Sequence, residues 1–254
     1  MAFGAIIIGD EILSGRRQDK HLSKVIELLA ARGLPLSWAR YCGDERPRLT
    51  ELLQQTMATG DIVFSFGGIG ATPDDHTRQC AAAAAGVALA LHPEAEAAIR
   101  ARFGAEVTPL RLRLGEFPLG SRIIPNPYNR IPGFALGLHH FLPGFPEMAW
   151  PMMEWVLDNW FAELHHTRAH SEASILVYQA REGELIEFME ALEAEHAVTI
   201  FSLPSLSTTA QRGYIELGAK GEPAVVQDVM QKICTEMTRR GYEWVTAKDT
   251  RPAA

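Results

Sequence analysis

Apolar and polar positions along the first 160 residues follow the pattern of a sheet covered by helices on both faces. Runs rich in apolar residues at 3–8, 36–41 and 62–66 predict three strands, the first of them buried. Between the strands, apolar residues recur at helical spacing and predict two helices, the first after a loop over 9–18. The apolar faces of these helices carry Leu22, Val25, Ile26 and Leu29, and then Leu49, Leu52, Leu53 and Met57.

This order makes two consecutive β-α-β units. Such units cross over with a right hand, and the carboxyl ends of their parallel strands lie at one edge of the sheet. The loops at Gly9–Glu11, Gly43–Asp44 and Gly67–Asp75 should therefore converge. A convergence of loops at that edge is where ligands bind in α/β proteins.

The pattern weakens in the following stretch. An alanine-rich helix covers 81–85, another helix starts at 92–94, and no element is assigned to 104–122. Short strands are predicted at 123–124, 134–138 and 140–142, followed by a helix from Glu147 to Phe161. Its three tryptophans favour core or subunit contacts over a cofactor site.

A polar stretch near residues 165–168 marks a domain boundary, so we expect one domain over 1–165 and a second over 170–250. The second segment has β-α-β-β-α order and a further short strand at 243–245, which predicts a small ferredoxin-like or KH-like α+β domain. No Gly-x-x-Gly loop with basic neighbours is present in it, so RNA binding is not expected. We interpret it as a lid or an oligomerisation module.

Composition narrows the possible partners. The chain has 254 residues, 47% of them hydrophobic, and a net charge of −7, which argues against nucleic acids and anionic membranes as partners. The three cysteines are widely spaced, so the sequence indicates neither a zinc site nor a disulfide framework. We therefore expect the protein in the reducing cytoplasm. No export signal or membrane span is expected from the N-terminal run, which ends at Gly9–Glu11. An anionic substrate would depend on glycine amides, a metal or single arginines.

The most informative segment follows the third strand and reads Gly-Gly-Ile-Gly-Ala-Thr-Pro-Asp-Asp-His-Thr over residues 67–77. Glycines at a strand-to-helix turn let backbone N–H groups approach a phosphate. Asp74 and Asp75 would repel a bare phosphate, and a divalent cation bridging them to it resolves that conflict. Helix capping by Asp74 and Thr77 is the alternative. His76 is either a ligand contact or a surface residue at the helix start.

These residues resemble the Gly-Gly-x-Gly-Pro-Thr-x-Asp-Asp-x-Thr motif of the molybdopterin-binding family of MoaB, Mog and gephyrin-type proteins, in its CinA-type form. Residues 9–15, Gly-Asp-Glu-Ile-Leu-Ser-Gly, are similar to the family's first loop, Asp19 and 43–44 match further positions, and 143–148 resemble its Pro-Gly-x-Pro-x-Glu-Met loop. Ala71, His21 and the 129–133 loop depart from the usual residues. The resemblance implies a three-layer α/β sandwich with a mostly parallel sheet, and the CinA-type deamidase domain is not expected in this chain.

CinA-type members are associated with metal-dependent hydrolysis of ADP-ribose-like dinucleotides, and Mog-type members with adenylyl transfer to molybdopterin. We expect the pyrophosphatase, with the adenylyltransferase role and a non-catalytic pterin- or nucleotide-binding regulator as alternatives. The resemblance implies a divalent cation (Mg²⁺, Mn²⁺ or Co²⁺), a small phosphorylated ligand, with molybdopterin as one candidate, and a homodimer or homotrimer. Expected catalytic residues are Asp44, Asp75 and Glu147, where Glu147 is equally well explained as a helix-start acid. Expected metal ligands are Asp44, Asp74 and Asp75. Expected ligand-binding residues are Gly9, Glu11, Gly67, Gly68, Gly70, Ala71, Thr72, Thr77, Asn126, Pro143 and Gly144.

Overall fold

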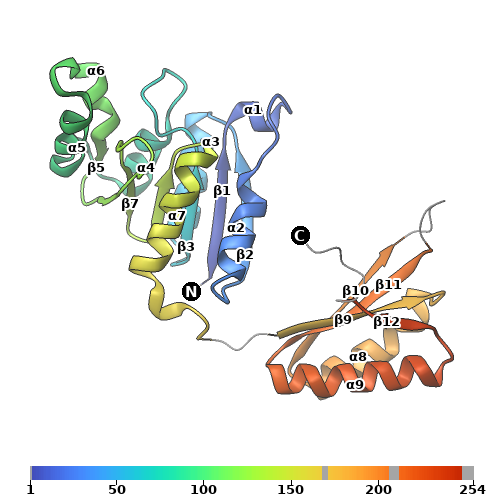
Figure 1. Ribbon diagram of the computed structural model, residues 1–254. Coiled ribbons are helices and arrows are strands. Elements are labelled where there is room, and N and C mark those ends of the chain that lie inside the picture. The colour runs from blue at the N-terminus through green and yellow to red at the C-terminus, as the bar shows by residue number, and fades with distance from the viewer. Residues whose placement is uncertain (1, 168–170, 206–211, 248–254) are drawn as a thin grey trace. The chain divides into compact units, whose positions relative to one another are not determined.

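The computed structural model describes residues 2–167, 171–205 and 212–247. The chain divides into two compact units, residues 1–165 and 166–254 (Figure 1). Each unit has its own hydrophobic core and is described by itself. No helix in the described residues is long and apolar enough to cross a membrane.

A six-stranded sheet forms the centre of the first unit. Its order is β2 (Leu36–Cys42), β1 (Phe3–Ile8), β3 (Ile62–Phe66), β8 (His139–Leu142), β7 (Gly133–Leu136) and β6 (Arg122–Ile124). The neighbours from β2 to β8 pair in parallel, whereas β7 is antiparallel to both β8 and β6. The expected mostly parallel sheet is confirmed.

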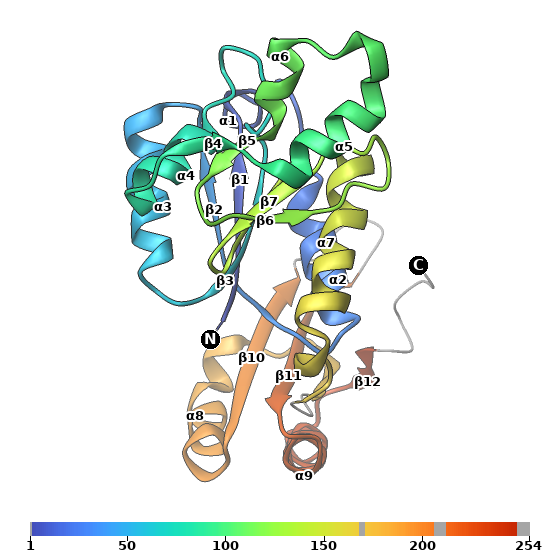
Figure 2. The ribbon, with the colours of Figure 1, turned by 90° about the vertical axis from the view of Figure 1, so that its left-hand side faces the viewer.

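Helices cover both faces of this sheet (Figure 2). Along β1, Ala5 and Ile7 face α2 (His21–Ala30) and α7 (Pro146–Trp160) in one core. Ile6 and Ile8 face α3 (Arg46–Met57) and α4 (Thr77–Ala85) in the other. Because successive residues of a strand point to opposite faces, one continuous apolar run fills both cores. The three-layer sandwich is thus confirmed.

Two stretches of this unit differ from the expected elements. A short helix, α1 (Asp10–Leu13), lies within the loop expected over 9–18. The unassigned region holds small elements, and the strand expected over 134–138 ends at Leu136 because Gly137 turns the chain with a φ of 58°. The remaining elements are β4 (Leu89–Leu91), α5 (Pro93–Phe103), η1 (Gly104–Glu106), α6 (Pro109–Leu112), η2 (Arg113–Gly115), β5 (Glu116–Pro118) and η3 (Ala162–Leu164).

The second unit is a four-stranded antiparallel sheet with two helices. In chain order it contains β9 (Ser171–Tyr178), η4 (Glu182–Glu184), α8 (Ile186–Glu195), β10 (Val198–Ser205), β11 (Tyr214–Gly221), α9 (Pro223–Arg239) and β12 (Trp244–Thr246). The sheet order is β10-β11-β9-β12. This arrangement is the ferredoxin-like split β-α-β pattern.

Candidate functional site

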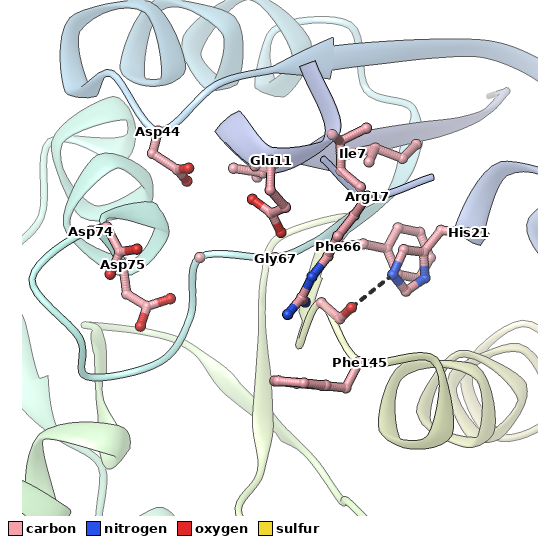
Figure 3. A pocket seen from close by; sticks show the side chains of 15 residues that line it. Ile7, Glu11, Arg17, His21, Asp44, Phe66, Gly67, Asp74, Asp75 and Phe145 are labelled. Carbon is pink, nitrogen blue, oxygen red and sulfur yellow. Dashed lines mark hydrogen bonds between the residues drawn. The ribbon is translucent and has the colours of Figure 1, made fainter. Parts of the chain in front are cut away.

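Four loops meet at one edge of the parallel sheet, each following the last residue of β1, β2, β3 or β8. They surround a cavity of about 170 Å³ (Figure 3). The backbone continues the sheet pairing into these loops, since Gly9 N–H donates to Cys42 (3.0 Å) and Gly67 N–H to Leu142 (3.0 Å). The predicted convergence therefore produces a cavity rather than a flat edge.

The glycine loop after β3 presents unpaired backbone donors. The N–H groups of residues 68–71 form no hydrogen bond with any part of the chain that the structure describes. Gly67 and Gly68 have φ values of 110° and 67°, and a Cβ added to Gly68 would lie 2.2 Å from Oγ1 of Thr77. Consecutive free N–H groups in such a turn form a concave anion-binding nest. The loop thus has the geometry that a phosphate requires.

The first and second loops are tied together by a reciprocal pair of hydrogen bonds. The N–H of Asp10 donates to Oδ2 of Asp44 (2.9 Å), and the N–H of Asp44 donates to Oδ1 of Asp10 (3.1 Å). Burial raises the pKa of Asp44, with further contributions from the charges of Asp10, Glu11 and Asp74. Asp44 therefore orders the loops as well as lining the cavity.

Four carboxylates line the cavity, those of Glu11, Asp44, Asp74 and Asp75. Asp75 is fixed by Thr72, which donates to its Oδ2 from the backbone N–H (2.9 Å) and from the hydroxyl. No group of three His, Cys, Asp or Glu side chains in the described residues is arranged to hold a metal ion. The four acids are oxygen donors, the kind of group that binds Mg²⁺ when one or two carboxylates are joined by phosphate oxygens.

His21, the first residue of α2, joins this helix to the loop that follows β8. It is 5% exposed and stacks on Phe66 with ring centroids 4.6 Å apart. Its Nε2 lies 3.2 Å from the carbonyl oxygen of Gly144, which requires the proton on Nε2. Burial lowers the pKa of His21, so the imidazole is neutral near pH 7.

A second cavity of about 400 Å³ adjoins the first and shares Gly68, Asp75, Gly144 and Phe145 with it. Its walls include the predicted residues Gly70, Ala71, Thr72, Asn126 and Pro143, together with Leu114, Ile131, Pro132 and Met148. The Asn126 side chain accepts from the N–H groups of Tyr128 (3.0 Å) and Asn129 (3.4 Å), which shapes the turn. The cavity thus combines apolar walls with a few polar groups, as small-molecule pockets commonly do.

Two predicted residues lie away from these cavities. Thr77 is fully buried, and its hydroxyl donates to the carbonyl of Gly67 (3.0 Å). It therefore stabilises the glycine loop from its buried side. Glu147 lies in the first turn of α7 and lines a separate groove beside Lys20 and Lys24. His76 lies at the start of α4 and lines a third pocket.

Seven residues of the first cavity were not among the predicted site residues: Ile7, Ile8, Ile12, Arg17, His21, Phe66 and Phe145. Arg17, Phe66 and Phe145 carry no motif position, and His21 drew attention only as a departure. Arg17 and Phe145 lie within the same loops as predicted residues, so their nearness in sequence was the available signal. For His21 and Phe66 the signal was weaker, because both also belong to apolar faces of regular elements.

The fold and the cavity define a class of protein: an α/β sandwich with a glycine-rich loop and a cavity at the carboxyl end of a parallel sheet, the edge where α/β proteins bind their ligands. Within that class, the sequence profile described as "Probable molybdopterin binding domain" matches residues 4–163. The chain belongs to this family.

Several individual proteins are similar to parts of the chain. A CinA-like protein of Anaeromyxobacter dehalogenans (strain 2CP-1) is 34% identical over 169 residues, which cover 63% of this chain and 41% of the relative. A CinA-like protein of Geobacter metallireducens is 31% identical over 193 residues, covering 73% and 47%. The chain thus spans less than half the length of these relatives.

Among solved structures, the protein CinA from Thermoplasma acidophilum, described as having unknown function, is 27% identical. It superimposes with a TM-score of 0.57 and covers 63% of this chain and 98% of its own. The matched part corresponds in size to the first unit, which contains both cavities.

Proposed function

We propose that the first unit binds a phosphorylated ligand and hydrolyses its phosphoanhydride bond, with ADP-ribose-like dinucleotides as the substrate class. The observation that carries this proposal is the run of free N–H groups at 68–71, because Gly68 lines the cavity that also holds four carboxylates and residues 69–71 line the adjoining one. The amides neutralise phosphate charge, and the acids supply oxygen ligands for a divalent cation. A bound cation would add further neutralisation of the charge that develops at phosphorus.

The reaction adds one water to the pyrophosphate. The water oxygen forms a bond to one phosphorus, the bridging P–O bond breaks, and ADP-ribose yields AMP and ribose 5-phosphate. In this proposal Asp75 accepts the proton of the water, and the amides of residues 68–71 hold the phosphate oxygens. The second cavity receives the ring or sugar group that continues from the phosphate.

The test is incubation of the purified chain with ADP-ribose, FAD or NAD and Mg²⁺, Mn²⁺ or Co²⁺, with AMP release measured by chromatography. We expect release that Asp75→Asn lowers by about 100-fold or more, a general-base contribution. Glu147→Gln serves as the matched control, since Glu147 lines a separate groove.

Tight binding without turnover under every metal would refute the hydrolase and leave a binding protein. Molybdopterin is the second candidate ligand, favoured by the family match to the probable molybdopterin binding domain. Formation of adenylylated pterin from molybdopterin and ATP would replace the pyrophosphatase with a transferase.

A further inference from the structure

Arg17 extends from the first loop into the 170 Å³ cavity, and Figure 3 shows its side chain pointing inward between Glu11 and Phe145. The backbone N–H of Arg17 donates to the carbonyl of Glu11 (3.0 Å), which fixes its place just after α1. The guanidinium forms no hydrogen bond or ion pair within the described parts of the chain, so its N–H donors are available to a ligand.

The charge pattern around Arg17 is uneven. Four carboxylates line the cavity, while His21 is kept neutral by burial, which leaves Arg17 as the cation among the 15 lining residues. An arginine that served only to neutralise these acids would be paired with one of them. Among the residues that the structure describes, no carboxylate oxygen lies within 4.0 Å of the Arg17 guanidinium.

We propose that Arg17 is a phosphate-binding residue that holds the anionic group of the ligand against the glycine loop at Gly68, which lines the same cavity. Its planar guanidinium can donate two parallel N–H bonds to two phosphate oxygens, a geometry that lysine cannot reproduce. The chain has a net charge of −7, so a local cation is needed to favour an anion at this position. This inference rests on the proposed function and names the residue that distinguishes anionic ligands.

Calorimetric titration of the full chain with pyrophosphate and with ADP-ribose, at fixed Mg²⁺, tests the role of Arg17. Arg17→Gln should weaken both affinities by about 10- to 100-fold, the effect of losing a hydrogen-bonded charge. Arg17→Lys should weaken them less, because it keeps the charge and loses the paired geometry. Added salt should weaken the wild type more than Arg17→Gln.

Arg16→Gln is the matched control, since Arg16 is an exposed neighbour that does not line the cavity. Its affinities should equal those of the wild type. Thermal melting should be unchanged for all three variants, because the exposed Arg17 side chain has no hydrogen bond or ion pair to lose within the described residues. A melting point lowered in both Arg17 variants would assign Arg17 a structural role and overturn the inference.

The outcomes separate the inference from the proposed function. If the wild type binds and Arg17→Gln binds as tightly as Arg16→Gln, the role of Arg17 is refuted while the proposed function stands. If the wild type binds neither pyrophosphate nor ADP-ribose, the proposed function fails and the role of Arg17 fails with it.

Discussion

His139 and His140, adjacent residues on β8, should make the first unit sensitive to mild acid. Both are buried, at 2% and 0% exposure. His139 lies 2.9 Å from Oγ1 of Thr56, and His140 donates from Nδ1 to the carbonyl of Val63 (3.1 Å) while stacking on Phe64. Nε2 of His140 is buried without a partner among the described residues. Neither imidazole can gain a proton without leaving a charge in the core.

The direction and size of this change in the free energy of unfolding follow from the pKa values of the two histidines. Burial is the main cause that lowers the pKa of His139 to about 4 and of His140 to about 3. In the unfolded chain the imidazoles titrate near their usual pKa. The contribution of each histidine to the free energy of unfolding is therefore fully present above that pKa, and it is lost as the pH falls toward the lower pKa of the folded state. At about pH 5 the unfolded groups are about 1.5 pH units below a pKa of about 6.5, so each costs about 2 kcal/mol, or about 4 kcal/mol together.

The assay is urea unfolding at about pH 7.5 and about pH 5, followed by tryptophan fluorescence, in the wild type and in His140→Phe. Over this range the variant should lose about 2 kcal/mol less stability than the wild type, because one titrating group is gone. His166→Gln, which removes an exposed histidine, should behave as the wild type. Equal losses in the wild type and His140→Phe would refute the reasoning, since acid sensitivity would then arise elsewhere.

Three further substitutions probe the glycine loop and its support. Gly68→Ala should abolish ligand binding and cost about 1–3 kcal/mol, because its φ of 67° and the 2.2 Å approach to Thr77 both disfavour a Cβ; calorimetry and urea unfolding measure the two effects. Arg78→Met should cost about 2–4 kcal/mol by urea unfolding, since the buried guanidinium donates to the carbonyl of Gly70 (2.6 Å) and to two other carbonyls; unchanged stability would show that water replaces it. Mg²⁺-dependent ligand affinity should fall as pH drops through the raised pKa of Asp44, and Asp44→Asn should remove that dependence.

The parallel strands β1, β2 and β3 were predictable because runs rich in apolar residues alternate with amphipathic helices. The later strands were harder, since β6 has three residues and β7 and β8 have four each. Such short segments carry too few positions to establish a period. The stretch over 104–122 resisted assignment for the same reason, because it is built from several elements of three or four residues.

The residues of the candidate site were predictable where they belong to a loop motif with recognisable chemistry. They were not predictable where only tertiary contacts bring a residue to the cavity. The glycines at 67–70 and the acids at 74–75 stand out in sequence because they interrupt a regular strand and helix. Arg17 and Phe145 do not, since a single exposed arginine or phenylalanine is common on any surface. Only the convergence of the loops gives these residues a shared cavity.

The motif residues divide by role in a way that the sequence does not reveal. Thr77, Asp44 and His21 each bond to the backbone of a loop, joining α4 to the glycine loop, the second loop to the first, and α2 to the last. Gly68 and the carboxylates of Glu11 and Asp75 line the first cavity instead, and residues 69–71 line the adjoining one. Because the loops are already tied before a ligand arrives, binding need not order them, and that lowers its entropic cost. Substitutions of the tying residues should therefore disturb every ligand alike, whereas substitution of a cavity residue such as Arg17 should discriminate between anionic and neutral ligands.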